Sequence, residues 1–400
     1  MFFTHIFLFR FHKMVLGERM NKKTIGFNIA LFSILSIGMI MIYSASSIWA
    51  EFKTGNPYYY LLRQFLFFGI GLVGYIIASQ IHYSFWCKKA NAIFILCFVL
   101  LILVLIPGIG IVRGGARSWI GIGDFSIQPA EFMKIGLIIF TAKFLSKNEG
   151  ILKKNVNFYL YMVFVGIIFG LILLQPDFGS GVILVLAIVL LLFVGEFQIK
   201  NIFIGLLFSI AAITLMILSA PYRLDRITSF LDPWKDPLGS GFQIIQSLYA
   251  ISPSSLFGYG LFHSKQKFFY LPEPQNDFIF AIICEELGIC GGLLIVFLFA
   301  YLIHCGFKLA KYAKDAFASY LVFGFTALLM VQVFINIAVV IGLIPVTGVT
   351  LPFVSYGGSS LVISMFMMGI IHNVLRTAPK DIRFEYNKKA SNHTRPHLID

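Results

Sequence analysis

Long apolar runs are the feature that most constrains this chain. Runs of roughly 17 to 25 apolar residues recur along it, and each is long enough to cross a lipid bilayer. The 400 residues are 58% hydrophobic and only 12% charged, a composition outside the range of soluble domains. The sequence therefore predicts an all-α, polytopic integral membrane protein, and the short alternating strands of a membrane barrel are missing.

We predict ten transmembrane helices inside one helical domain, residues 25–376. A cytoplasmic N-terminal tail, 1–24, and a basic cytoplasmic C-terminal tail, 377–400, flank this domain. The predicted spans are 25–45, 60–80, 91–107, 130–146, 157–173, 178–195, 201–219, 278–303, 319–344 and 353–376.

Positive charge sets the predicted orientation. Most of the 31 Lys and Arg residues fall in the two tails and in alternate short loops. Cytoplasmic loops carry such an excess, so the protein is expected in the cytoplasmic membrane with both termini on the cytoplasmic side. The net charge of +13 is explained by topology and anionic lipid heads, and we expect no nucleic-acid partner. The long loop 220–277, between spans seven and eight, is then extracytoplasmic.

An acid at the start of span eight stands out chemically. The stretch KQKFFYLPEPQNDFIFAIICEE, residues 265–286, reaches Asp277 where an apolar helix begins. An ionised carboxylate at such a place is costly unless it is paired, hydrated or used. Asp277 is therefore the leading general base, because a half-buried carboxylate can have its pKa raised toward the working pH. Capping of the helix is an equally weighted alternative.

Other polar groups fall in the same predicted outer regions. Cations suit a phosphate-bearing ligand, and glycine-rich turns allow close approach of the backbone to a ligand. We expect an amphipathic ligand with an anionic or sugar-bearing head and a lipid tail. The candidate substrate-binding residues are Arg113, Arg117, Trp119, Lys134, Arg223, Arg226, Lys265, Lys267, Glu273 and Ser355.

Several polar residues, Lys134 among them, have structural interpretations. Glu131 and Lys134 share a helix face at i, i+3 and could form only an ion pair. Asp177 is expected to complement a helix N-terminus. Gln332 and Asn336 lie one turn apart and favour interhelical hydrogen bonds. Residues 241–251 could form an amphipathic interfacial helix. No zinc-ligand spacing or Ser-His-Asp order occurs, so no metal ligand is assigned.

Five motifs resemble one family of cell-wall polymerases. FLDPWKDPLGSGFQIIQSLYAI, KQKFFYLPEPQNDFIFAIICEELG, RSWIGIGDFSIQPAEFMK, QPDFGSG and IPVTGVTLPFVSYGGSS are similar to the SEDS family, which comprises FtsW, RodA and SpoVE. The motifs FFYLPEPQ and FLDPWKDPLGSGFQ are more similar to those of FtsW and SpoVE than to those of RodA. The family usually has Thr before its essential acid, whereas this chain has Asn276.

The resemblance implies a function and its partners. It implies a peptidoglycan glycosyltransferase that polymerises lipid II, the undecaprenyl-pyrophosphate-linked disaccharide-peptide, during cell division or spore cortex synthesis. It places the family's essential acid on Asp277 and its important Trp and Lys on Trp119 and Lys134. A class B penicillin-binding transpeptidase would be the partner, together with division or sporulation machinery. No cofactor is certain, but a divalent cation, Mg²⁺ or Mn²⁺, could share in stabilising the pyrophosphate. A lipid II flippase is the alternative function.

Overall fold

The computed structural model describes residues 22–113, 115–122, 125–148, 150–195, 228–252 and 255–378. Nine long helices lie in these ranges: α2 Lys22–Thr54, α3 Tyr59–Gln80, α4 Ser84–Leu103, α5 Pro129–Lys147, α6 Asn155–Leu173, α7 Phe178–Val194, α11 Ile279–Lys311, α12 Ala316–Val340 and α13 Gly358–Thr377. Each overlaps one predicted span. The predicted span 201–219 lies outside the described residues, so the total of ten stays a prediction.

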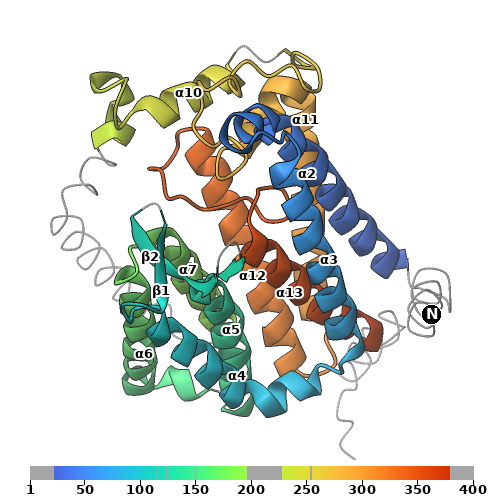
Figure 1. Cartoon of the computed structure of the whole chain (residues 1–400). Helices are drawn as coiled ribbons and strands as arrows, with labels where there is room; N and C mark the ends of the chain where they lie inside the picture. The colour runs from blue at the N-terminus through green and yellow to red at the C-terminus, as the bar shows by residue number, and fades with distance from the viewer. Residues whose placement is uncertain are drawn as a thin grey trace, which may run out of the picture.

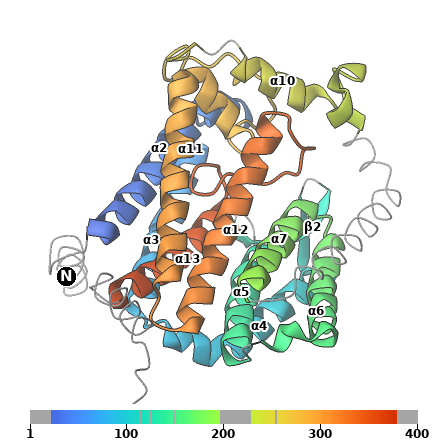
Figure 2. The ribbon, with the colours of Figure 1, turned by 180° about the vertical axis from the view of Figure 1, so that it is seen from behind.

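The bundle has the composition of a multi-pass membrane protein. Among the residues that the structure describes, seven helices are long and apolar enough to cross a bilayer: α2, α3, α4, α6, α11, α12 and α13. Figures 1 and 2 show α2, α3, α11, α12 and α13 on one side and α4 to α7 on the other. Helix α12 contacts α5, α7, α11 and α13, and thereby joins the two groups.

The predicted all-α class needs one correction. Three short strands, β1 Gly110–Arg113, β2 Ala116–Ile122 and β3 Phe125–Ile127, form an antiparallel sheet in the order β1-β2-β3. The all-α prediction includes no strand in this region. Alternation in it is short and interrupted by Gly114, Gly115, Gly121 and Gly123, which weakens a strand pattern.

Several helix ends follow from local sequence. Pro129 occupies the first turn of α5, where its missing N–H is not needed. The side chain of Asp177 caps α7 by accepting a hydrogen bond from the Ser180 amide (3.2 Å). Asp315 caps α12 in the same way through Ala318 (2.9 Å). The role predicted for Asp177 is therefore confirmed.

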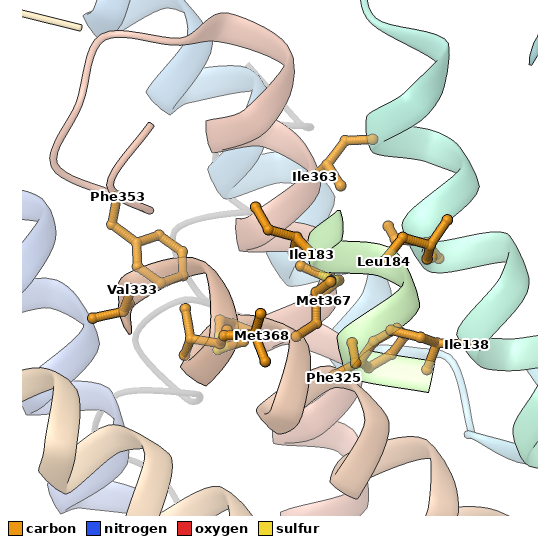
Figure 3. Packing of buried hydrophobic residues seen from close by; sticks show 14 of the residues in the cluster. Ile138, Ile183, Leu184, Phe325, Val333, Phe353, Ile363, Met367 and Met368 are labelled. Atoms are coloured by element: carbon orange, nitrogen blue, oxygen red, sulfur yellow. The ribbon is translucent and has the colours of Figure 1, made fainter. Parts of the chain in front are cut away.

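The core lies where α5, α7, α12 and α13 meet. In Figure 3, Ile138 of α5 and Ile183 of α7 face Phe325 of α12 and Met367 of α13. Small residues bring other helices close together, as is usual in membranes. A Cβ on Gly369 of α13 would lie only 2.5 Å from the Tyr75 carbonyl oxygen of α3.

Two further segments surround the start of α11. Helix α10, Phe242–Ile251, matches the predicted helix 241–251 and buries Ile244 and Ile245. Residues 341–357 connect α12 to α13 without regular structure, and they bury Leu351 to Ser355. The last long helix therefore begins at Gly358 and not at 353, because the bent segment takes up those residues.

Candidate active site at the start of α11

Asp277 lies directly before α11 and is half-buried. The helix begins at Ile279, and its N-cap position is Phe278, which makes no side-chain capping bond. Capping by the Asp277 side chain stays an alternative prediction. Its backbone carbonyl accepts a hydrogen bond from Asn336 Nδ2 of α12 (2.7 Å), which fixes the position of the residue.

Asn336 also reaches the bent segment 341–357. Its Nδ2 donates to the Val349 carbonyl (2.7 Å), and Gln332 one turn away donates to the Thr350 carbonyl (3.1 Å). These amides were predicted to bond between helices. They hold loop carbonyls instead, because the segment 341–357 and the start of α11 both approach α12.

The segment 341–357 also touches Asp277's own neighbours. The Tyr356 amide donates to the Gln275 carbonyl (2.8 Å), and Gln64 Nε2 of α3 donates to the Ser355 carbonyl (3.3 Å). The Ser355 hydroxyl accepts from the Leu351 amide (2.8 Å). The hydroxyl of this predicted substrate-binding residue thus closes a turn of its own segment.

Charged and aromatic groups gather beside Asp277. Glu273 pairs with Lys53 at the end of α2 (3.4 Å) and accepts from Asn276 Nδ2 (2.8 Å). The rings of Tyr60 and Tyr356 lie 5.0 Å apart, edge to face. Burial raises the pKa of the Tyr356 phenol, while the charges of Arg63 and Arg113 lower it. This places Arg113 of the sheet in the same neighbourhood.

The predicted set did not include Lys53, Tyr60, Arg63 or Tyr356. No local signal could have placed Tyr60 near Asp277, because the two lie more than 200 positions apart in the chain.

The sheet carries three predicted site residues. The Arg113 guanidinium lies over the Trp119 ring, 5.5 Å from its centre, and Arg117 Nη1 is 3.5 Å from the Leu105 carbonyl. The sheet is tied to the bundle at Gln128, whose amide donates to the Ser359 hydroxyl of α13 (3.2 Å). The Gln128 side chain donates to Asp177 (2.6 Å).

Lys134 is buried in α5 with only 2% of its side chain exposed, and its ammonium lies 2.6 Å from Glu131. The predicted ion pair is confirmed. Substrate binding by Lys134 stays a prediction. Arg223 and Arg226 lie outside the described residues. Lys265 is exposed, with its ammonium 4.8 Å from the centre of the Tyr259 ring.

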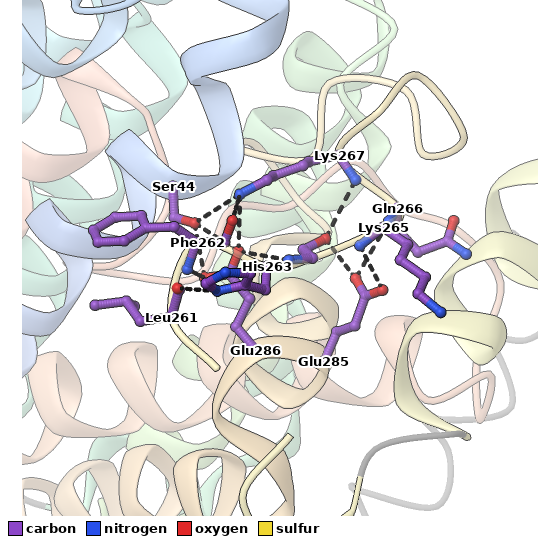
Figure 4. A network of polar contacts seen from close by, with 10 residues as sticks. Ser44, Leu261, Phe262, His263, Lys265, Gln266, Lys267, Glu285 and Glu286 are labelled. Atoms are coloured by element: carbon purple, nitrogen blue, oxygen red, sulfur yellow. Dashed lines mark hydrogen bonds and ion pairs between the residues drawn. The ribbon is translucent and has the colours of Figure 1, made fainter. Parts of the chain in front are cut away.

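Two adjacent glutamates of α11 organise the loop that precedes Asp277 (Figure 4). Glu286 accepts from the Ser44 hydroxyl of α2 (2.6 Å) and pairs with the Lys267 ammonium (3.3 Å). Glu285 accepts from the Lys265 amide (2.9 Å). The sequence placed both glutamates within the helix but gave them no role, because their partners come from the preceding loop and from α2.

The family model described as "Cell cycle protein", which covers FtsW, RodA and SpoVE, matches residues 26–380. The chain belongs to the FtsW/RodA/SpoVE family.

Its relatives are similar over most of their length. Stage V sporulation protein E of Bacillus subtilis is 49% identical over 349 residues, 86% of this chain and 94% of the relative. A probable peptidoglycan glycosyltransferase FtsW of Geobacter sp. is 40% identical over 84% of this chain and 92% of its own.

Solved structures of this family share the fold. A chain from a peptidoglycan synthase complex, studied for the coordination of polymerization and crosslinking, has a TM-score of 0.73 at 28% identity. The match covers 89% of this chain and 98% of the other. The rod shape determining protein RodA of Thermus thermophilus has a TM-score of 0.66 at 25% identity, over 89% and 97% of the two chains.

Proposed function

We propose that this protein is a peptidoglycan glycosyltransferase that joins lipid II units into glycan strands at the outer face of the cytoplasmic membrane. The observation that carries the proposal is the placement of Asp277. This half-buried acid lies at the start of a membrane-length helix, where Asn336 holds its backbone carbonyl, and Glu273 and Tyr356 lie nearby. Relatives in the same family include named probable peptidoglycan glycosyltransferases.

The chemistry assigned to Asp277 is general base catalysis. Its carboxylate takes the proton from the 4-hydroxyl of the acceptor sugar. The freed oxygen forms a bond to the anomeric carbon of the donor sugar, and the bond from that carbon to the pyrophosphate breaks. Undecaprenyl pyrophosphate leaves with the electron pair. A correctly placed base accelerates such a step by about 10²- to 10⁴-fold.

Cations would stabilise the departing pyrophosphate. Arg113, Arg117 and Lys134 are the candidates in the described residues, with Arg223 and Arg226 outside them, and Trp119 lies beneath the Arg113 guanidinium. A divalent cation stays a prediction. The described ranges hold no group of three or more His, Cys, Asp or Glu side chains suited to it.

The orientation follows from charge and from chemistry. Because we propose polymerisation at the outer face of the membrane, Asp277 would face outward and both termini would lie in the cytoplasm, as the distribution of Lys and Arg predicts. We also propose a class B penicillin-binding transpeptidase as partner, supported by the similarity to a chain of a peptidoglycan synthase complex. The protein would serve cell division or spore cortex synthesis.

The decisive experiment is a polymerisation assay. Purified protein, with its transpeptidase if needed, is given lipid II in detergent, and glycan strands are separated by size. We expect Asp277→Asn to lose activity by about 10²-fold or more, the range for a lost general base. Asp232→Asn, at a half-buried residue that pairs only loosely with Lys235 (3.9 Å), is the matched control.

Two results would overturn the proposal. Equal polymer from Asp277→Asn and wild type would remove the catalytic role. Flipping of lipid II across vesicles by a wild-type protein that makes no polymer would favour the flippase alternative.

A further inference from the structure

The loop before Asp277 is attached to α11 at both of its ends. At one end, Asp277 enters the helix directly through Phe278. At the other, residues 262–267 are bound by Glu285 and Glu286, six and seven positions into the helix that begins at Ile279. At 1.5 Å per residue this is about 10 Å along the helix axis. The residues between form a closed loop whose base is the helix itself.

The two glutamates satisfy a run of loop amides. Glu286 accepts from the Phe262 amide (3.0 Å) and the Ser264 amide (3.1 Å). Glu285 accepts from the Lys265 amide (2.9 Å) and from the Ser264 hydroxyl. Both glutamates are essentially buried, at 2% and 0% exposure. Buried charges this well bonded fix a geometry, because each lost bond would leave a desolvated polar group.

Lys267 supplies the countercharge. Its ammonium lies 3.3 Å from Glu286 and donates to the Phe262 carbonyl (2.6 Å), and the residue is 5% exposed. Ser44 of α2 completes the cluster, with its hydroxyl 2.6 Å from Glu286. We use the term glutamate clamp for Ser44, Lys267, Glu285 and Glu286.

The helix is also broken beneath the clamp. Gly288 has non-helical dihedral angles within α11 (φ 68, ψ −166). The carbonyls of Glu285 and Glu286 accept from the amides of Tyr259 (3.0 Å) and Gly260 (2.9 Å). On the other side of the break, the amides of Ile289 and Cys290 donate to the carbonyls of Ser255 and Leu256. The loop thus replaces the helix's own hydrogen bonds at the break.

We propose that the glutamate clamp positions Asp277 for catalysis, with Glu286 and Lys267 as positioning residues. This inference rests on the proposed role of Asp277. It assigns Lys267 to holding the loop and not to binding the pyrophosphate, since its ammonium is buried between Glu286 and Phe262. Positional errors of about 1 Å at a reacting group can lower rates by about 10²-fold, so the clamp would act on kcat.

The test compares Glu286→Gln with wild type in the polymerisation assay and by amide hydrogen exchange. We expect kcat to fall by about 10²-fold while KM changes by less than about twofold, because no substrate contact is lost. The amides of Phe262 and Ser264 should exchange faster. Asp232→Asn should leave all three quantities unchanged.

Lys267→Met gives a second, independent reading. A positioning role lowers kcat at constant KM, whereas a substrate contact raises KM. Lys267→Met also tests the proposal if Glu286→Gln does not fold, because in Lys267→Met the Glu286 carboxylate still accepts from the amides of Phe262 and Ser264 and from the Ser44 hydroxyl.

Two outcomes would overturn the inference: wild-type kcat together with faster exchange in Glu286→Gln, or a raised KM alone in Lys267→Met. The proposed function fails separately, if wild type makes no polymer or if Asp277→Asn is fully active.

Discussion

Gly258 and Gly288 lie back to back across the break in α11. A Cβ on Gly288 would lie 2.4 Å from the Gly258 nitrogen, and a Cβ on Gly258 would lie 2.5 Å from the Glu286 carbonyl oxygen. Both residues have positive φ, 68° and 69°. The loop reaches the Glu285 and Glu286 carbonyls only because neither position carries a side chain.

We therefore expect Gly288→Ala to be severely destabilising. Its dihedral angles lie in a region that is almost restricted to glycine, which costs about 1–3 kcal/mol before any clash is counted. Thermal unfolding of the detergent-purified protein measures the effect. Gly69→Ala, in α3 with nothing within 4 Å of the added Cβ, should unfold as wild type does. Normal stability of Gly288→Ala would contradict the described break.

Asn336→Leu should reduce activity strongly. The change removes one hydrogen bond from the carbonyl of Asp277 and one from the carbonyl of Val349, and each lost hydrogen bond costs about 0.5–1.5 kcal/mol. Since one of these carbonyls belongs to Asp277 itself, polymer formation should fall even at temperatures well below the melting temperature of the variant. Asn157→Ala, which loses only a bond to the Ile151 carbonyl (3.1 Å), is the control. Wild-type activity in Asn336→Leu would show that this bond does not place Asp277.

A double-mutant cycle separates the two interpretations of Lys134. Lys134→Met should lower the free energy of unfolding by about 3–5 kcal/mol, because the buried Glu131 carboxylate loses its partner. Glu131→Gln combined with Lys134→Met should regain most of that stability. We expect the double variant to stay inactive, as the family resemblance implies for this Lys. If activity returned together with stability, Lys134 would be only a structural partner.

Tyr83, between α3 and α4, should give stability a dependence on alkaline pH. Burial, helped by the hydrogen bond to Asp315 (2.6 Å), raises the pKa of its phenol to about 12. The folded state therefore holds this proton more tightly than the unfolded state does. The resulting stability is complete below pH 10, the ordinary pKa, and is lost as pH rises toward 12.

The measurement is thermal unfolding from pH 9 to 12 for wild type and for Tyr83→Phe. The difference between the two curves should shrink across this window, because the variant has no phenol to titrate. Tyr249→Phe, an exposed residue of α10, should follow wild type throughout. A constant difference between wild type and Tyr83→Phe would contradict the prediction.

The helices were predictable because the bilayer imposes a length that sequence records directly. The predictions of a helix cap at Asp177 and of an ion pair between Glu131 and Lys134 were also correct, since caps and i, i+3 pairs depend only on local spacing. The sheet 110–127 was missed because its strands are short and rich in glycine. Local pattern alone does not distinguish such a hairpin from a loop.

The clamp could not be predicted for a different reason. Glu286 meets Ser44 across 242 positions of sequence. Apart from Lys267, its other partners are the backbone amides of Phe262 and Ser264, a group that nearly every residue has. Only the fold selects which amides come within reach. The position of Asp277 was inferred from the cost of a charge beside an apolar helix, whereas its link to Asn336 depends on how α11 and α12 pack.

The two helices α12 and α6 are exposed very differently. In α12, five consecutive residues, 325–329, are all buried, so every side of the helix meets protein at that level. In α6, Val156, Leu160, Val163 and Ile167 form one exposed stripe. During evolution, the exposed stripe on α6 can tolerate the substitution of one apolar residue by another. A change at residues 325–329 of α12 would instead have to be accommodated by the neighbouring helices on both sides.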